Sequence, residues 1–190
     1  MQLVAYGAQD IYLTGNPQIT FFKVVHRKHT NFSMESIEQT LSSSTNSEGI
    51  QTCTILRNGD LIKNCYITMT AGTYGMKEGE AYDMIDNVEV EIGGNFVDRH
   101  HGDWNAIWWE LSTPEEKVNA LRNMLIENSG SADGAVNKTP CYYPLNFWFC
   151  RNPGLALPLI ALQYHEVKLI ITWGNVPTGG SANVWVDYIY

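Results

Sequence analysis

Two glycine-containing turn signals, each standing between runs of β-type residues, constrain what this 190-residue chain can fold into. Asn58-Gly59 separates the run 51–57 from the run 61–70. Gly93-Gly94-Asn95 follows the run 87–92, whose letters VEVEI alternate with period two, and leads into 96–100. Residues that tolerate a positive φ between two such runs are the strongest short-range indication of a β-hairpin. The sequence therefore predicts two antiparallel hairpins.

Further β-type runs surround these hairpins. They are 19–28, 32–41, 142–150 (interrupted by Pro144), 167–173 and 184–190. Because the runs do not alternate with helices, a doubly wound α/β fold is not expected. Eight or nine short strands predict an all-β fold, a β-sandwich or jelly roll, in a single domain over 1–190.

One segment departs from the β pattern and indicates a helical insertion. Thr113 is a suitable N-cap, Pro114 suits the first helical position, and Glu116 completes a capping box. Apolar residues then follow at helical spacing. We expect a helix over 114–127, lying outside the sandwich.

The charge balance argues against a nucleic-acid-binding protein. The net charge is −8, with twelve Lys and Arg against twenty Asp and Glu, which suits phosphate binding poorly. A single basic patch stands near the N-terminus: Lys23, His26, Arg27, Lys28 and His29. A low charged fraction of 17% with 12% aromatics indicates surface buried against a partner. An all-β fold, which favours aromatics, accounts for the composition equally well.

The four cysteines and the N-terminus limit the class of protein further. The first residues lack the basic and apolar regions of a secretory signal, and no run approaches the roughly 18 apolar residues of a membrane span.

The sequence contains no CxxC pair, so its four cysteines do not indicate a structural zinc site. Cys141 and Cys150, placed on one expected strand, are too far apart to bond, whereas Cys53 and Cys65 flank the first hairpin and could approach each other. Free thiols are the default expectation.

The cluster closest to a chemical site is His100-His101-Gly102-Asp103. Two histidines and an aspartate are metal-ligand types, but consecutive strand residues point to opposite faces, so the two rings should diverge. No His-x-His accompanies them, and we expect no metal centre. The cluster instead forms a turn that leads to three tryptophans: Trp104, Trp108 and Trp109.

No other pattern indicates catalysis. The chain has no Gly-x-Ser-x-Gly elbow and no phosphate-binding loop. Glu89 and Glu91 share one strand face and are more typical of a solvent-facing pair than of an acid/base pair. Asn31 and Asn137 fit the N-glycosylation rule, which carries little weight without a secretory signal. The residues thus predict no catalytic, cofactor-binding or metal residues, and favour a structural or binding role.

Several long stretches carry a resemblance to a known family. They are 7–37, which begins GAQDIYLTGNPQITFF, then 57–62, 88–94, 153–169 with PGLALPLIALQYHEVKL, and 185–190. Together they resemble the N-terminal half of the major capsid proteins of nucleocytoplasmic large DNA viruses, of the chlorella-virus type. The resemblance implies a jelly-roll β-sandwich with a helical insertion. This sandwich would be the first half of a double jelly roll, whose second jelly roll is absent from this chain.

The resemblance also implies a function. It implies a structural subunit of an icosahedral capsid, located in the virion and assembled in the host cytoplasm into trimeric, pseudo-hexagonal capsomers. Its partners would be copies of itself, neighbouring capsomers and minor capsid proteins. It would make no direct contact with nucleic acid, would need no cofactor, and would reach an inner viral membrane only through other proteins. The basic patch would then pair with acidic neighbours.

The candidate residues of an assembly interface are aromatic: Tyr12, Phe21, Phe22, Trp104, Trp108 and Trp109. Two alternatives stay open at this point. One is a β-sandwich module that recognises carbohydrate through exposed Trp and Tyr. The other is a metal-dependent jelly-roll enzyme.

Overall fold

The computed structural model describes residues 30–42, 49–70, 80–125, 140–174 and 181–190. A compact unit runs from Met34 to Tyr190, and the description below concerns this unit. The expected strand over 19–28, with the basic patch, lies outside the described residues. So do four residues singled out in the sequence: Tyr12, Phe21, Phe22 and Asn137.

The strands, in chain order, are β1 (Met34–Gln39), β2 (Gly49–Ile55), β3 (Leu61–Thr70), β4 (Ile85–Ile92), β5 (Asn95–His101), β6 (Cys141–Pro144), β7 (Leu157–Pro158), β8 (Val167–Trp173) and β9 (Ser181–Ile189). The helices are α2 (Glu80–Asp83), α3 (Gly102–Ser112), α4 (Glu115–Met124) and α5 (Trp148–Arg151). Two 3₁₀ turns, η1 (Pro153–Leu155) and η2 (Leu159–Leu162), flank β7.

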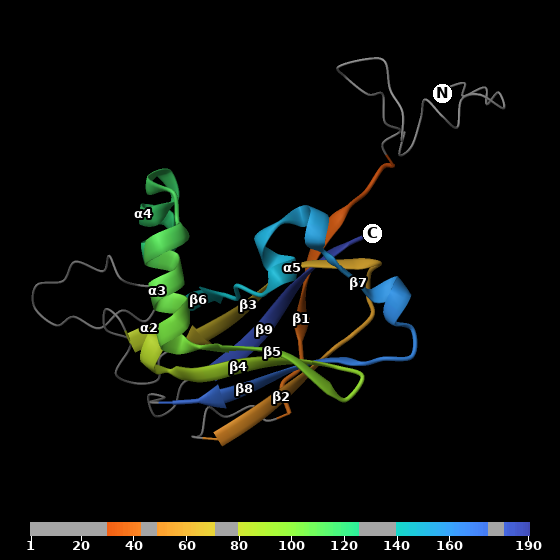
Figure 1. The fold of residues 1–190 in the computed structure, drawn as a ribbon, viewed down its shortest axis with the longest axis horizontal. Helices are drawn as coiled ribbons and strands as arrows, with labels where there is room; N and C mark the ends of the chain where they lie inside the picture. Colours follow the sequence, from red (N-terminus) through yellow and green to blue (C-terminus); the bar gives the residue numbers. More distant parts are fainter. Residues whose placement is uncertain (1–29, 43–48, 71–79, 126–139, 175–180) are drawn as a thin grey trace, which may run out of the picture. The chain divides into compact units, whose positions relative to one another are not determined.

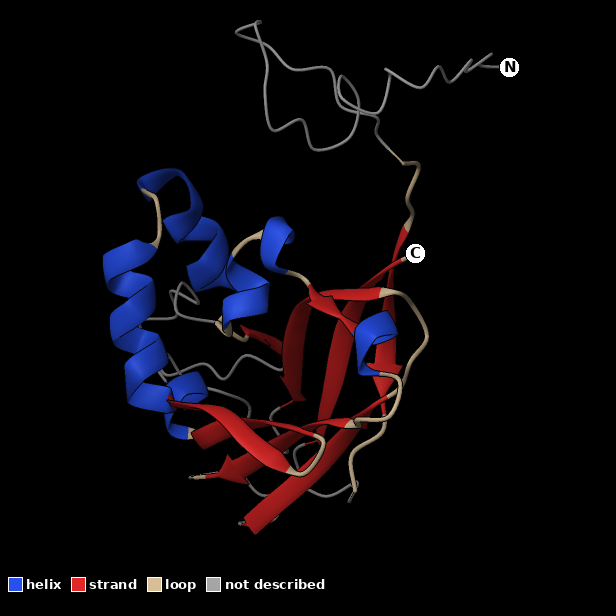
Figure 2. Ribbon diagram, turned by 45° about the vertical axis from the view of Figure 1, so that its right-hand side comes forward, coloured by secondary structure: helices blue, strands red, loops and turns tan. Residues whose placement is uncertain are grey.

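The strands of the described part form two antiparallel sheets, which Figures 1 and 2 show as two facing layers. One sheet has the order β1-β9-β3-β6, with the short β7 also paired to β3. The other has the order β2-β8-β4-β5. Most consecutive strands lie in opposite sheets, which is the connectivity of a jelly roll. The predicted all-β jelly-roll sandwich is therefore confirmed.

The hairpin predicted at Asn58-Gly59 is wrong, because β2 and β3 belong to different sheets. Strand β2 pairs with β8 along its whole length, and β3 pairs with β9. The chain turns a corner between the layers, and distant side chains satisfy its backbone. The Leu56 N–H donates to Gln39 Oε1 at 2.9 Å, and the Leu56 carbonyl accepts from the Tyr188 hydroxyl at 2.6 Å.

Gly59 serves close packing at this corner rather than a left-handed turn. A Cβ at this position would lie 2.9 Å from the Tyr188 Cβ and 3.1 Å from the Ile189 carbonyl oxygen. The first distance is shorter than Cβ atoms show in proteins, and the second is tighter than most Cβ contacts. The glycine thus lets the corner lie against the end of β9. The Asn-Gly pair looks like a hairpin signal in the sequence, but its glycine is needed for close packing and not for a positive φ.

The second predicted hairpin, between β4 and β5, is confirmed. Gly93 and Gly94 both have positive φ, 59° and 81°, as a type I′ turn requires. Val88 and Val90 point into the core, while Glu89, on the other face, pairs with Arg99 across the hairpin. The pair Glu89 and Glu91 therefore belongs to the outer face, as expected.

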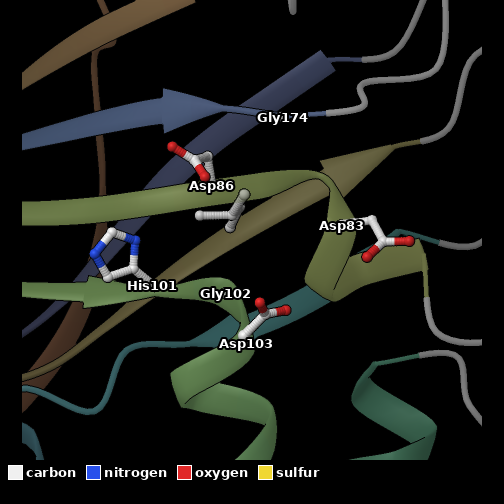
Figure 3. A pocket seen from close by; sticks show the side chains of 7 residues that line it. Asp83, Asp86, His101, Gly102, Asp103 and Gly174 are labelled. Carbon is white, nitrogen blue, oxygen red and sulfur yellow. The ribbon is translucent and has the colours of Figure 1, made fainter.

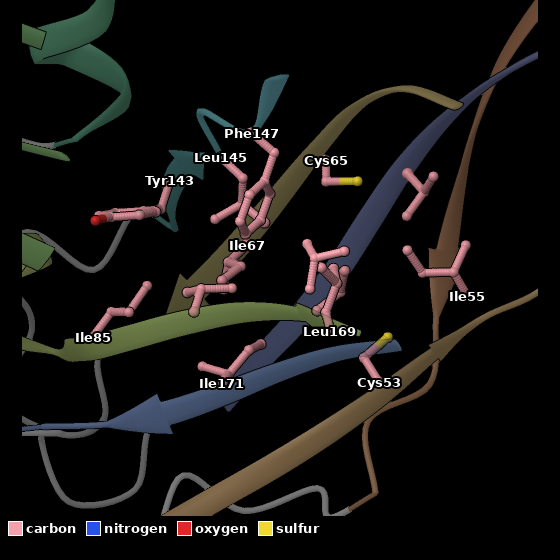
Figure 4. Close-up of a cluster of buried hydrophobic side chains, with 14 of the residues drawn as sticks. Cys53, Ile55, Cys65, Ile67, Ile85, Tyr143, Leu145, Phe147, Leu169 and Ile171 are labelled. Atoms are coloured by element: carbon pink, nitrogen blue, oxygen red, sulfur yellow. The ribbon is translucent and has the colours of Figure 1, made fainter. Parts of the chain in front are cut away.

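The core lies between the two sheets and follows the period of two. Strand β8 alternates buried and half-buried residues without interruption. Figure 4 shows Ile67 from one sheet and Leu169 and Ile171 from the other between the layers. Cys53 and Cys65 are also buried there, one from each sheet, and not across a hairpin. All four cysteines are among the described residues, and none forms a disulfide.

The described part of the insertion between β5 and β6 holds two helices where one was predicted. Helix α4 begins at Glu115 and corresponds to the predicted helix, but α3 was missed. Thr113 is not an N-cap, because its N–H donates to the Trp109 carbonyl at 3.0 Å and so closes α3. Pro114 occupies the N-cap of α4 without a side-chain cap bond, so the predicted capping box does not form. Both helices lie outside the sheets (Figures 1 and 2).

The strand predicted over 142–150 is also wrong beyond Pro144. After β6 the chain makes one further bond to β3, from the Leu145 N–H to the Cys65 carbonyl at 3.0 Å. Phe147 then enters the core, where it is fully buried, and helix α5 follows. This segment links the edge strands of the two sheets, β6 and β5. The Phe147 ring stacks on the His100 ring of β5, with 4.6 Å between the ring centres. Tertiary packing therefore overrides the local β pattern here.

We predict that Tyr188→Phe destabilises the domain by about 1 kcal/mol, because it removes the part-buried hydrogen bond from the Tyr188 hydroxyl to the Leu56 carbonyl. Urea unfolding monitored by circular dichroism measures the change. Tyr142→Phe, which removes a hydroxyl from an exposed side chain of β6, is the matched control and should change stability by less than about 0.5 kcal/mol. Equal stability of both variants would contradict the role assigned to the corner.

Candidate functional site

His100 and His101 diverge as the sequence predicts. His100 is 6% exposed and stacks on Phe147, while His101 is exposed on the other face of β5. The His100 Nε2 pairs with Asp98 Oδ2 at 3.2 Å, whereas its Nδ1 is buried without a hydrogen-bond partner. A neutral ring with the proton on Nε2 fits these contacts, since Nε2 then donates to Asp98. His100 is thus part of the core and is not placed to bind a metal together with His101.

Burial is the main cause that lowers the pKa of His100. The Arg151 charge lowers it further, while the attraction and hydrogen bond of Asp98 oppose the shift. These groups come from the two elements that face the ring, β5 and α5. The net effect keeps the buried ring neutral where an exposed histidine would begin to take up a proton.

An acidic pocket of about 310 Å³ lies where β4, β5 and α3 meet. Four titratable side chains line it: Asp83, Asp86, His101 and Asp103. Figure 3 shows that these side chains do not converge, since Asp86 points away from Asp103. Within the described residues, no group of three or more His, Cys, Asp or Glu is placed to hold a metal ion. The pocket thus offers negative charge without a ligand set.

Two glycines explain why the backbone is so closely packed around this pocket. A Cβ on Gly102 would lie 2.5 Å from the Tyr82 carbonyl oxygen, and one on Gly174 would lie 2.5 Å from that of Asp83. The Gly174 N–H also donates to the Met84 carbonyl at 3.0 Å. Glycine at both positions lets α3 and the end of β8 contact the turn between α2 and β4. The backbone that lines the pocket is thus a tight junction of α2, α3, β4 and the end of β8.

Helix α3 presents two different faces. Asn105 and Trp109 face inward: the Asn105 amide donates to the Tyr143 hydroxyl at 3.0 Å, and the Trp109 ring lies 5.0 Å from that of Tyr143. Both residues are buried, Asn105 completely and Trp109 to 6% exposure. Trp109 is therefore part of the core, and its assignment to an assembly interface stays a prediction.

The outward face of α3 carries an apolar stripe, defined as Trp104, Ile107, Trp108 and Leu111. The spacing i, i+3, i+4, i+7 places these residues on one side of the helix. Trp104 is 42% exposed, Ile107 54% and Leu111 80%. The rings of Trp104 and Trp108 lie 5.7 Å apart. Of the six predicted interface residues, Trp104 and Trp108 therefore lie at the surface of the domain. The helical spacing of these four apolar residues is also the sequence signal that could have revealed α3.

A groove of about 530 Å³ adjoins the apolar stripe between α3, α4 and α5. Trp108 forms part of its wall, and the Arg151 guanidinium lies 4.4 Å from the centre of the Trp108 ring. Lys117 and Cys150 also line the groove. Arg151 is held in place because its Nε donates to the Asn146 carbonyl at 2.9 Å. The apolar stripe and the groove adjoin each other and together form a candidate contact surface.

Among the described residues, no helix is long and apolar enough to cross a membrane.

Comparison with known proteins gives a consistent result. A family model described as "Major capsid protein N-terminus" matches residues 20–190. The major capsid protein of Pyramimonas orientalis virus is 52% identical over 207 residues, covering 100% of this chain and 52% of that protein. The major capsid protein of Paramecium bursaria Chlorella virus 1 is 43% identical over 206 residues, covering 100% of this chain and 47% of that protein. The chain thus spans about half the length of these relatives.

Solved structures agree with the sequence comparison. A quasi-atomic model of the PBCV-1 virus capsid matches with a TM-score of 0.74 and 36% identity, covering 90% of this chain and 45% of that chain. The Faustovirus major capsid protein matches with a TM-score of 0.64, covering 91% of this chain and 57% of that chain. Its 11% identity means that this second likeness concerns the fold alone.

We predict that His100 makes the domain less stable in mild acid. Its pKa is lowered in the folded state, so the unfolded chain binds a proton first as the pH falls below about 6.5, and stability falls with it. His100→Gln, which cannot ionise, should flatten the fall in urea midpoint between pH 7.5 and pH 5. His101→Gln, on the exposed face, is the control and should keep the wild-type slope. An unchanged slope in His100→Gln would refute the assignment.

Proposed function

This chain belongs to the family of major capsid proteins, and on that premise we propose that it is a structural subunit of an icosahedral viral capsid. The family match over 20–190 is the observation that carries the proposal. Two features of the structure support it. The strand order is that of a jelly roll, and the apolar stripe on α3 leaves large side chains exposed. The role is structural rather than enzymatic, in keeping with relatives that are named as capsid proteins.

The proposed place of the chain is the virion capsid, with assembly in the host cytoplasm. The subunit associates with copies of itself as a trimer, and the trimers form pseudo-hexagonal capsomers that contact neighbouring capsomers and minor capsid proteins. Any contact with an inner viral membrane is made through those other proteins. The net charge of −8 supports the further proposal that the subunit does not bind the genome directly.

We also propose that the chain represents one jelly roll of a protein with two. The length of the relatives, about twice that of this chain, supports this architecture. The resemblance noted in the sequence, which is to the N-terminal half of the family, supports a position as the first of the two. The carbohydrate-binding alternative receives no support from the relatives and is not carried further.

The apolar stripe is the surface that we assign to assembly. Exposed clusters of large apolar side chains mark interaction sites, and interfaces are enriched in aromatic residues. Each such side chain contributes about 1.5–3 kcal/mol when it is fully buried. The stripe can therefore anchor a contact with another protein surface through its three exposed side chains, Trp104, Ile107 and Leu111. The Arg151–Trp108 contact beside them fixes one edge of the surface.

We predict that the purified chain forms oligomers at micromolar concentration, and that the triple change Trp104→Ser, Ile107→Ser and Leu111→Ser weakens this association at least tenfold. Loss of the apolar contact is the physical reason, and light scattering with sedimentation velocity is the measurement. The control is Leu155→Ser with Ile160→Ser, which removes exposed apolar side chains from η1 and η2. Circular dichroism checks that both variants fold.

A monomeric wild-type chain would contradict the proposed self-assembly. Oligomers that persist in the α3 variant and dissociate in the control variant would instead place the interface at η1 and η2.

A further inference from the structure

A stack of three aromatic rings connects β5 to the segment 145–151, which carries α5. The His100 ring of β5 lies on the Phe147 ring, with 4.6 Å between the ring centres and 19° between the planes. Phe147 is the N-cap residue of α5 and also stacks on Phe149 of that helix, at 5.8 Å. All three rings are buried. The position of α5 against β5 therefore depends on a ring that can take up a proton.

The same segment borders the surface that we assign to assembly. The Arg151 guanidinium lies 4.4 Å from the centre of the Trp108 ring, and its Nε donates to the Asn146 carbonyl at 2.9 Å. The Asn146 amide in turn donates to Asn105 Oδ1 of α3 at 3.4 Å. Arg151 and Trp108 both line the groove between α3, α4 and α5. A movement of 145–151 would therefore move one wall of the groove and the edge of the apolar stripe.

The contacts of His100 leave no place for a second ring proton. Its Nε2 pairs with Asp98 Oδ2 at 3.2 Å, whereas its Nδ1 is buried without a hydrogen-bond partner. A proton taken from solvent at Nδ1 would create a buried N–H without an acceptor and a positive charge that has lost its water. The face of the Phe147 ring attracts a cation, but it supplies no acceptor to the new N–H. The protonated ring is therefore accommodated only when water reaches it.

The neighbouring groups decide in which direction pH acts. On the side of β4, His100 pairs with Val88, which is apolar. Burial is the largest cause that lowers the pKa of His100, Arg151 of α5 lowers it further, and Asp98 of β5 opposes them. When the segment 145–151 is detached, the ring lies in water with its ordinary pKa of about 6.5. The open form thus takes up the proton first as the pH falls, so acid favours opening and neutral pH favours the stack.

We propose that His100 is an acid-sensitive contact that controls the assembly surface. Protonation at Nδ1 separates His100 from Phe147 and releases the segment 145–151 from β5, while the two sheets stay folded. Arg151 then no longer holds Trp108 at the edge of the apolar stripe. The resulting loss of assembly rests on the proposed capsid function, whereas the release itself depends only on the folded domain.

Hydrogen exchange of the wild-type chain, followed by mass spectrometry, tests the release. Protection factors, which already correct for the intrinsic pH dependence of exchange, are compared at pH 7.5 and pH 5 for peptides covering 145–151 and β8. The protection of 145–151 should fall at least about fivefold, up to about thirtyfold, the limit for an open ring with a pKa of about 6.5. It should also be lower than that of β8 at both pH values. Constant protection of 145–151, or equal protection of the two segments, would overturn the proposal.

Three variants assign the effect to the ring. His100→Gln cannot ionise, so its protection of 145–151 should change less than about twofold between the two pH values. His101→Gln, on the exposed face of β5, is the matched control and should retain the wild-type fall. Phe147→Leu keeps the titrating ring but removes the stack, and should lower the protection of 145–151 already at pH 7.5. A wild-type fall in His100→Gln would refute the role of the ring, and the wild-type measurement decides alone if a variant does not fold.

Light scattering of the assembled chain tests the consequence for assembly. A shift from pH 7.5 to pH 5 should weaken association of the wild-type chain at least about fivefold, and His100→Gln should resist this change. Oligomers that persist in acid while 145–151 loses protection would contradict the control of assembly. A chain that forms no oligomers at either pH would contradict the capsid proposal, and hydrogen exchange on the monomer would still decide whether His100 releases the segment.

Discussion

The corner at Leu56 is the point on which the two-layer arrangement depends. A chain that leaves one sheet for the other must give up ladder partners, and a buried backbone group without a partner is costly. Here the Leu56 N–H finds the side chain of Gln39 and its carbonyl finds Tyr188, residues from β1 and β9. Both partners come from strands of the larger sheet, so the corner and that sheet stabilise each other. With those bonds in place, β2 is free to pair with β8 and β3 with β9.

A similar dependence holds at the other end of the smaller sheet, where β5 runs into α3. Gly102 allows the backbone of α3 to begin directly beside Tyr82 and Ile85, and Asn105 then bonds the Tyr143 hydroxyl in the interior. These two anchors fix the rotation of the helix about its axis. Because Asn105 and Trp109 are turned inward, the apolar stripe must face outward. The surface assigned to assembly is thus set by a buried amide and a glycine that take no part in it.

Family membership and physical structure contribute different parts of the functional conclusion. The relatives identify the class of protein, and the jelly-roll topology agrees with it. Neither indicates which surface of the domain associates. That choice follows from exposure and spacing on α3.

The sequence by itself determined the elements whose pattern is local. The β-type run 167–173 predicted β8 with the bounds that the structure shows. Gly93-Gly94 predicted the β4–β5 hairpin because its two-residue turn needs positive φ at both positions. The long stretches shared with capsid proteins also identified the family. Tertiary structure alone decided which sheet each strand joins, since alternation marks an apolar face but not the strand beside it. It also decided the corner at Asn58-Gly59, whose hydrogen-bond partners lie 17 and 132 residues away in the chain. Those distances explain why no local signal could separate the corner from a hairpin.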